Sequence, residues 1–335
     1  MCGELNEVPP VQERLLEAAA RIEPVLEELL PRGRDDYLSE AVWYHMATGG
    51  KRIRPAICLL TCEQLGGDAE DAVYFAAAVE ILHNMLLIHD DVEDGDTVRR
   101  DRATVWVRYG PENAINVGDY MLGVATEAVL RSPVSDRKRV RLMQAFATAY
   151  MDTCRGQAFD LNTRGTERLS VERYLEMVTL KTGRYMALGM LGGAIVADAD
   201  QEVISLLEEL GERMGAAFQI RDDTIDLTVG KGRGGVTGND VREGKSSILY
   251  AHALNAARPE QRRTLTAIMR RPREETTDED VRLVSELYEA LGSPDFARAE
   301  ADRLIEEGFQ IIERIPLADR EFFRELADYM VSRET

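Results

Sequence analysis

Nearly every segment of the chain repeats its apolar residues at three- and four-residue spacing, the period of an amphipathic α-helix. No run alternates apolar and polar residues between hairpin turns, so no strand is expected. The pattern predicts an all-α bundle of about a dozen helices, which we expect to form one domain over residues 1–335. The expected helices cover Val11–Leu30, Pro55–Leu65, Asp71–His89, Glu112–Leu130, Lys138–Asp160, Val171–Met186, Gln201–Leu227, Lys245–Ala257 and Pro259–Met269, with three more from about Thr277.

The net charge of the chain limits the partners that it can bind. The formal charge is −19, from 60 acidic and 41 basic side chains. Nucleic acid binding needs a basic surface, so nucleic acid is not an expected partner. Small phosphorylated substrates are not excluded, because a few local cations can hold them. The acidic excess itself fits either a salty cytoplasm or simple solubility.

Several sequence features favour the reducing cytoplasm. No uninterrupted apolar run reaches the length of a membrane-spanning helix, so stable membrane insertion is not expected. The N-terminal segment up to Pro24 lacks the basic and then apolar pattern of a signal peptide. The four cysteines do not suggest a disulfide framework in a chain of this length, and we expect Cys58 and Cys62 to be buried packing residues. The other two are Cys2 and Cys154.

Two clusters of aspartates stand where apolar helices are expected to end. Asp90, Asp91 and Asp94 form DDVED, and Asp222, Asp223 and Asp226 form DDTID. Aspartates four residues apart share a helix face, where they repel each other, and the helix dipole disfavours them at a C-terminus. One cluster alone would be interpreted as a solvated acidic helix end, but a matched pair predicts a bound cation. Oxygen ligands indicate a hard divalent metal, and Mg²⁺ favours coordination shared between carboxylates and phosphates.

Positively charged residues lie close to both clusters in the sequence. They are Lys51, Arg52 and Arg54 in GGKRIRP, Arg99 and Arg100 in DGDTVRRD, Lys181 in LKTGRY and Lys245 in REGKSS. Each alone would be an ordinary surface cation, but together they predict a cradle for diphosphate, because arginine forks bind phosphate oxygens in pairs. His83 lies two turns before Asp90, and its spacing fits a packed core histidine as well as a phosphate contact. The glycine-rich loop Val229–Gly244 lacks the spacing of a nucleotide-binding loop.

A series of motifs resembles the trans-isoprenyl diphosphate synthases, also called polyprenyl synthetases. In chain order these motifs are GGKRIRP, HNMLLIHDDVED, RRDRATVW, GQAFDL, LKT, FQIRDDTIDL and GNDVREGK. The resemblance covers about residues 40–255, with the catalytic motifs within 49–245, and it implies the isoprenoid synthase fold with helices around a central cavity. The departures are small: many relatives have Gly, Pro and His where this chain has Asp101, Ala103 and Trp106.

The resemblance also implies a role for each matching residue. Asp90 and Asp94 would bind two Mg²⁺ ions with support from Asp91, and Asp222 would bind a third with support from Asp223 and Asp226. Arg99, Lys181 and Lys245 would help to hold an allylic diphosphate, and Lys51, Arg54, His83 and Arg100 would hold isopentenyl diphosphate. Thr182 and Gln219 would line the reacting centre. The family also implies a homodimer.

The helix before Asp90 suggests the length of the product. The growing chain should extend toward the N-terminus of this helix, where one turn rises about 5.4 Å, close to one isoprene unit. Met85 and Leu86, fifth and fourth before Asp90, would then form the floor of the tunnel, with Leu82 deeper. Their size predicts geranylgeranyl diphosphate, with farnesyl diphosphate next and C25 or longer products as a further alternative. Met85 as a simple core residue stays open.

Two other kinds of protein share parts of this pattern. A class I terpene cyclase has the helical fold and the first aspartate motif but normally carries a different second metal motif and needs no isopentenyl site. A non-catalytic subunit of a heteromeric synthase tends to lose aspartates, and all six are present here. The resemblance therefore favours an active prenyltransferase over both alternatives.

Overall fold

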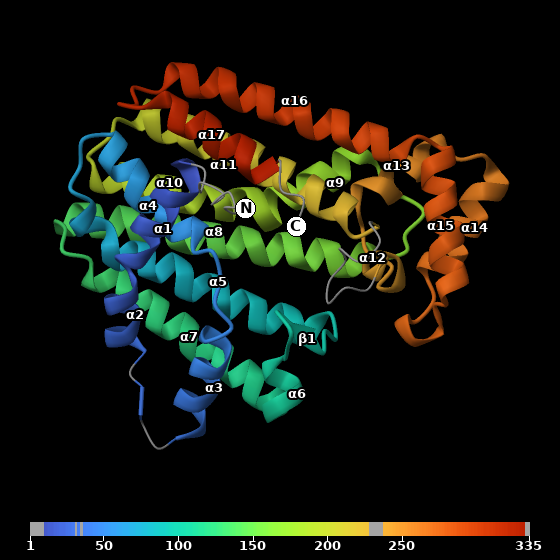
Figure 1. The fold of residues 1–335 in the computed structure, drawn as a ribbon, viewed down its shortest axis with the longest axis horizontal. Coiled ribbons are helices and arrows are strands. Elements are labelled where there is room, and N and C mark those ends of the chain that lie inside the picture. Colours follow the sequence, from blue (N-terminus) through green and yellow to red (C-terminus); the bar gives the residue numbers. More distant parts are fainter. Residues whose placement is uncertain (1–9, 31, 34–35, 228–236, 332–335) are drawn as a thin grey trace, which may run out of the picture. The chain divides into compact units, whose positions relative to one another are not determined.

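The computed structural model describes residues 10–30, 32–33, 36–227 and 237–331. These residues are helical almost throughout, which confirms the all-α prediction (Figure 1). The first half contains α1 (Pro10–Ala20), α2 (Glu23–Leu29), α3 (Tyr37–Met46), α4 (Ile53–Gln64), a 3₁₀ turn (Ala69–Ala72), α5 (Val73–Glu93), α6 (Val105–Tyr109), α7 (Pro111–Arg131) and α8 (Asp136–Thr163). The second half contains α9 (Val171–Val178), the π-helical segment η2 (Thr179–Gly183), α10 (Arg184–Val196), α11 (Gln201–Ile225), α12 (Asn239–Arg242), α13 (Ile248–Ala256), α14 (Pro259–Met269), a second 3₁₀ turn (Arg273–Glu275), α15 (Asp278–Ala290), α16 (Ser293–Arg314) and α17 (Arg320–Val331).

The chain divides into two compact units, each assembled from separated segments. Unit 1 comprises Met1–Phe146, Leu188–Ser205 and Ile315–Tyr329, and unit 2 comprises Ala147–Ala187, Leu206–Arg314 and Met330–Thr335. The interpretation of residues 1–335 as one domain stays a prediction. The first aspartate cluster belongs to unit 1 and the second to unit 2, so the two are described in turn below.

The centre of unit 1 is helix α5, which contacts α2, α3, α4, α6 and α7. In Figure 1 it runs beside α7. Its N-terminal half is rich in buried alanine, and the short side chains let the neighbouring helices approach closely. Gly192 of α10 packs against Phe75 of α5, where an added Cβ would lie 2.1 Å from the ring. By length and composition the segment Ala69–Glu93 could cross a membrane, which the sequence analysis did not expect. However, 72% of its most apolar 18-residue stretch is buried in the protein, as in a core helix.

The core of unit 2 lies around helix α13, which contacts α9, α14, α15 and α16. The short α13 is apolar on nearly all sides and contributes the fully buried Tyr250. Glycines allow α11 to approach the π-helical segment closely: a Cβ on Gly215 would lie 2.6 Å from the Cα of Gly183. The packing around η2 therefore depends on both glycines.

Besides α3, α6 and α12, which were not among the expected helices, three local features differ from the prediction. The predicted helix Val11–Leu30 is broken at Arg21 and Ile22, because Pro24 lacks the amide needed to continue the hydrogen bonds of α1 and instead occupies the first turn of α2. The predicted helix Val171–Met186 contains the π-helical segment η2 and continues to Val196. The third difference is a two-residue strand pair, β1 (Val98–Arg99) and β2 (Arg102–Ala103), where no strand was expected.

The other helices begin and end within a few residues of the boundaries predicted from the sequence. Lys245 lies in the loop before α13 rather than in the helix predicted from that residue, because Ser247 caps the first turn of α13. The three C-terminal helices are present, and Thr277 is the N-cap of the first. Cys58 and Cys62 are buried, as predicted, with free thiols, and Cys154 is exposed. Cys2 and residues 229–236 of the glycine-rich loop lie outside the described residues.

Candidate active site

The first aspartate cluster occupies the C-terminal end of α5. Asp90 and Asp91 lie in its last turn and Asp94 is its C-cap. The negative end of the helix dipole therefore lies next to three carboxylates. Asp90 and Asp94 are partly exposed, whereas Asp91 is buried and accepts a 2.7 Å hydrogen bond from Nε of Arg99. Burial raises the pKa of Asp91 to about 7 despite this arginine. The other oxygen of Asp91, Oδ2, is buried without a hydrogen-bond partner among the described residues.

The GGKRIRP turn leads into α4 and has an unusual backbone conformation. Gly49, Gly50 and Arg52 all have positive φ angles, of 78°, 151° and 47°. Lys51 is exposed, whereas the Arg52 side chain is only 10% exposed and forms ion pairs with Glu23 and Glu80. The turn therefore separates the two adjacent cations, since Lys51 faces solvent and Arg52 is occupied by carboxylates.

Three of the predicted basic residues gather around this turn. Nη1 of Arg54 lies 3.4 Å from Nε2 of His83 on α5. Because a guanidinium can only donate, this contact makes Nε2 the acceptor and leaves the proton on Nδ1. Burial, followed by the charge of Arg54, holds the pKa of His83 well below its usual range, so the ring is neutral. Arg100 donates to Oγ1 of Thr48, and its guanidinium lies beside Gly50, where an added Cβ would be 3.1 Å away.

The second aspartate cluster lies at the end of α11, and its three members have different surroundings. Asp222 is exposed. Asp223 is buried and accepts hydrogen bonds from the Tyr174 hydroxyl at 2.7 Å, Nε2 of Gln219 at 3.1 Å and the Ile248 amide at 3.1 Å. Asp226 follows the helix, is buried, and accepts a 3.0 Å bond from the backbone amide of Asp240. Burial raises the pKa of Asp223 to about 6, against the charge of Lys245.

Both predicted lysines of unit 2 pair with buried carboxylates. Lys181, inside the π-helical segment η2, donates a 2.8 Å hydrogen bond to Asp160. Burial would raise the pKa of Asp160, but the charges of Lys181 and Lys245 outweigh it and hold the pKa below its usual range. Lys245 lies 3.1 Å from Asp240 and 3.8 Å from Asp223. A π-helical segment of this kind is frequent at functional sites, because its wider turn redirects side chains.

Thr182 and Gln219 connect the π-helical segment that carries Lys181 to the second aspartate cluster. The Thr182 hydroxyl donates to Oε1 of Gln219 at 3.2 Å, and the amide of Gln219 donates in turn to Asp223. The structure therefore gathers five predicted residues of unit 2, Lys181, Thr182, Gln219, Asp223 and Lys245, into one connected region.

Three residues of this region were not singled out in the sequence. Asp160 lies within GQAFDL and Asp240 within GNDVREGK, so both stood in quoted motifs, but nothing local indicated that they would pair with Lys181 and Lys245. Tyr174 lies in an amphipathic helix and has the pattern of a core aromatic residue. Its contact with Asp223 joins two distant segments and leaves no local signal.

The residues predicted to limit product length differ in accessibility. Met85 and Leu82 have no exposed surface, while Leu86 is partly exposed, as are His83, Leu87 and Asp90. These four accessible residues follow the three- and four-residue spacing of one helix face. Of the residues predicted to form the floor, Leu86 is therefore the one that lies on the same accessible face of α5 as Asp90.

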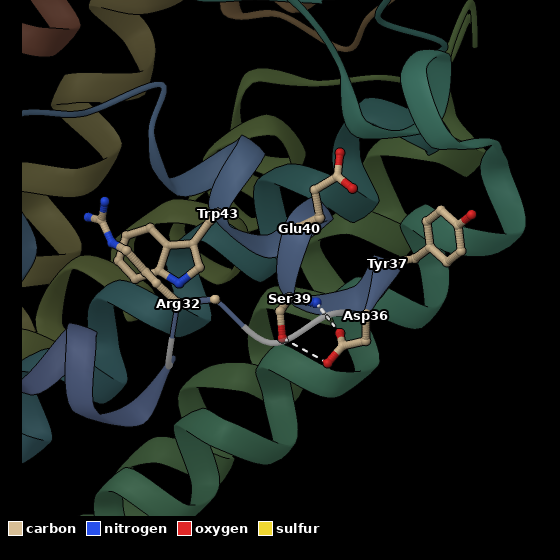
Figure 2. A pocket seen from close by; sticks show the side chains of 7 residues that line it. Arg32, Asp36, Tyr37, Ser39, Glu40 and Trp43 are labelled. Atoms are coloured by element: carbon tan, nitrogen blue, oxygen red, sulfur yellow. Dashed lines mark hydrogen bonds between the residues drawn. The ribbon is translucent and has the colours of Figure 1, made fainter.

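Two cavities of the described chain are lined by other residues. A hollow of about 600 Å³ at the start of α3 is lined by Arg32, Asp36 and Trp43 among others (Figure 2). In it Arg32 stacks 3.9 Å from the centre of the Trp43 ring, and Asp36 caps α3 through the Ser39 amide. The second, about 290 Å³, lies in unit 2 beside Arg221 and Glu289. Neither contains a predicted site residue.

Comparisons with known proteins decide the family. The profile of the polyprenyl synthetase family matches residues 35–289. The chain belongs to the polyprenyl synthetase family. It is therefore a prenyltransferase, and the resemblance read from the sequence is confirmed.

Relatives of this polyprenyl synthetase match it over nearly their whole length. A short chain isoprenyl diphosphate synthase from Methanothermobacter thermautotrophicus is 33% identical, over 95% of each chain. A geranylfarnesyl diphosphate synthase from Aeropyrum pernix is 34% identical, over 89% of this chain and 95% of the relative. The crystal structure of geranylgeranyl pyrophosphate synthetase from Pyrococcus horikoshii superposes with a TM-score of 0.88 at 32% identity, covering 97% of this chain and 98% of that one.

Proposed function

We propose that this prenyltransferase joins isopentenyl diphosphate to allylic diphosphates head to tail and releases geranylgeranyl diphosphate. The observation that carries the proposal is the contact between Arg54 and His83 beside Lys51 and Arg100. These residues form a cationic surface in addition to the lysines near the second aspartate cluster. A reaction with two diphosphate substrates needs two such surfaces, whereas a cyclase has one diphosphate to hold.

The residues divide between the two substrates by position and charge. Lys51, Arg54, His83 and Arg100 would bind isopentenyl diphosphate, with neutral His83 donating through Nδ1–H. Arg99, Lys181 and Lys245 would contact the allylic diphosphate and neutralise the charge that grows on it as its carbon–oxygen bond breaks. The isopentenyl double bond would then attack the allylic carbon, and a proton would leave the product, accepted by the released pyrophosphate. Thr182 and Gln219 would lie at the reacting centre.

We propose magnesium ions as cofactors of these aspartates, although no three His, Cys, Asp or Glu side chains of the described residues gather closely enough to hold a metal ion by themselves. Asp90 and Asp94 are partly exposed carboxylates at a helix C-terminus, and Asp91 has one buried oxygen without a partner among the described residues. Asp222 offers an exposed carboxylate, supported by Asp223 and Asp226. This all-oxygen set suits Mg²⁺, which is typically held by one or two carboxylates together with substrate phosphates. Three bound Mg²⁺ ions would supply positive charge to the departing diphosphate.

The size of the residues on the accessible face of α5 supports a C20 product. Leu86 lies one helical turn before Asp90 and is bulkier than alanine but smaller than phenylalanine. A C15 product and a C25 product remain the alternatives, and one relative is named a geranylfarnesyl synthase. We also propose that the enzyme works in the cytoplasm as a homodimer, as its family suggests.

The proposal is tested by incubating the purified protein with Mg²⁺, isopentenyl diphosphate and each allylic diphosphate in turn. Mass spectrometry of the dephosphorylated products should give a series that ends at C20. A series that ends at C15, or at C25 or beyond, would keep the reaction and reject the proposed floor. No isopentenyl-dependent elongation would instead favour a cyclase, if the allylic substrate cyclises, or a non-catalytic subunit, if it stays intact.

A further inference from the structure

Arg52 of the GGKRIRP motif contacts carboxylates on two sides. Its Nε lies 3.3 Å from Glu23 of α2, and its Nη1 lies 2.6 Å from Glu80 of α5. Glu23 is 48% exposed at its side chain, whereas Glu80 is only 4% exposed. The two ion pairs therefore differ in strength, because an exposed pair contributes little and a buried one cannot lose a partner without a large cost.

Glu80 belongs to a buried polar group that extends along α5. Its carboxylate also accepts a 2.7 Å hydrogen bond from Nδ2 of Asn84, one turn further along the helix. His45 of α3 is also buried, and burial lowers its pKa to about 3. Both Asn84 and His45 are nearly inaccessible to solvent. The Arg52–Glu80 and Asn84–Glu80 bonds therefore join the GGKRIRP turn to α5 through side chains that are shielded from water.

The backbone of the turn explains why such a connection is needed. Three of the four residues from Gly49 to Arg52 have positive φ angles, and Arg52 is not a glycine. The left-handed conformation is strained for a non-glycine residue, so it persists only where tertiary contacts favour it strongly. The buried contact with Glu80 supplies that constraint at the residue where the strain lies.

We propose that Arg52 and Glu80 are positioning residues for the binding of isopentenyl diphosphate, and that Asn84 orients Glu80. Their ion pair fixes the turn to α5 so that Lys51 and Arg54, on either side of Arg52, project toward the same diphosphate. The inference rests on the proposed function, which assigns Lys51 and Arg54 to this substrate. Arg52 itself does not touch the substrate, because its guanidinium is occupied by the two carboxylates.

The test compares two neutral replacements around the same guanidinium. In Glu80→Gln the buried partner loses its charge, and in the matched control Glu23→Gln the exposed partner does. We expect Glu80→Gln to raise KM for isopentenyl diphosphate at least about tenfold, with kcat and the allylic KM changed less than about threefold. Glu23→Gln should leave all three constants within about twofold of the parent.

A second pair of variants covers the case in which Glu80→Gln does not fold. The double variant Arg52→Gly/Glu80→Gln leaves no unpaired buried charge, and its glycine accepts the positive φ without strain. It should fold and show the same rise in KM, while Arg52→Lys, which keeps a cation opposite Glu80, should recover most of the parent value. Folded variants with an unchanged KM for isopentenyl diphosphate, or with a fall in kcat alone, would overturn the inference.

Lys51→Ala separates this inference from the proposed function. If Lys51→Ala raises KM for isopentenyl diphosphate and the Glu80 variants do not, only the positioning role is wrong. If Lys51→Ala leaves that KM unchanged, the assignment of the turn to isopentenyl diphosphate fails, and the positioning role fails with it.

Discussion

The hydroxyl of Tyr174 donates a 2.7 Å hydrogen bond to Oδ2 of Asp223, and both residues are buried in unit 2. The bond stabilises the ionised form of a carboxylate whose pKa burial raises to about 6. Tyr174 therefore maintains the charge of a residue in the second aspartate cluster without itself carrying any sequence signal of function.

Tyr174→Phe removes this donor and leaves the carboxylate partly unsatisfied. We expect the free energy of unfolding to fall by about 1.5–3 kcal/mol, the cost of losing a hydrogen bond to a buried charged group. Denaturant unfolding at pH 8 measures the change. Tyr109→Phe is the matched control, since its hydroxyl bonds to Glu40 at the surface, 2.9 Å away, and it should cost less than about 0.5 kcal/mol. Equal losses in the two variants would contradict a special role for the buried bond.

Gly50→Ala addresses the close approach of Arg100 to the GGKRIRP turn. Gly50 has a φ of 151°, and an alanine Cβ would lie 3.1 Å from the guanidinium of Arg100. The side chain should move away, so we expect KM for isopentenyl diphosphate to rise about tenfold or more, as measured by steady-state kinetics. Gly66→Ala is the control, because Gly66 also has a positive φ, of 80°, but no atom lies within 4 Å. It should cost about 1 kcal/mol of stability and leave KM unchanged.

The helices and the positions of the aspartates could be predicted from the sequence, whereas several contacts of the site could not. Hydrophobic period is a local property, so it predicted α5 and α11 and placed the aspartates at their ends. The Tyr174–Asp223 bond joins residues 49 positions apart, and the π-helical segment at Lys181 packs closely against α11 at Gly183 and Gly215. Both depend on tertiary contacts that no local pattern encodes. The same holds for Arg52, which looked like one more phosphate ligand until its buried partner was known.

Asp101→Gly tests the strain in the turn between β1 and β2. Arg100 and Asp101 occupy this two-residue turn with φ angles of 50° and 60°, a conformation that favours glycine at its second position. Glycine at position 101, which many relatives have, should raise the free energy of unfolding by about 0.5–1 kcal/mol. Thermal or denaturant unfolding measures the gain. Asp101→Ala keeps the Cβ penalty, so an equal gain in that variant would argue against strain as the cause.

The lowered pKa of the buried His45 should make the free energy of unfolding depend on pH. Burial lowers its pKa from the usual 6.5 to about 3, so between these values the unfolded chain binds a proton that the folded chain does not. Stability must therefore fall as the pH falls through this window, by roughly 2 kcal/mol at pH 5 from this group alone. His45→Gln should remove that part of the slope between pH 7 and 5, measured by denaturant unfolding. Above pH 7 the slopes of parent and variant should coincide, and identical slopes below pH 7 would contradict the assignment.

Product length tests which residues of α5 limit the growing chain. Leu86 lies on the accessible face one turn before Asp90, whereas Met85 is fully buried. We expect both Leu86→Phe and Met85→Phe to shorten the product, because a phenyl ring one turn before the aspartates removes space for about one isoprene unit. Met85→Phe should also cost about 1–3 kcal/mol of stability through overpacking, which the more accessible Leu86 avoids. Mass spectrometry of dephosphorylated products measures the shift, with Leu130→Phe as a control, since Leu130 is 53% exposed on α7. An unchanged product from Met85→Phe would make Met85 a simple core residue, and unchanged products from both variants would reject this part of α5 as the floor.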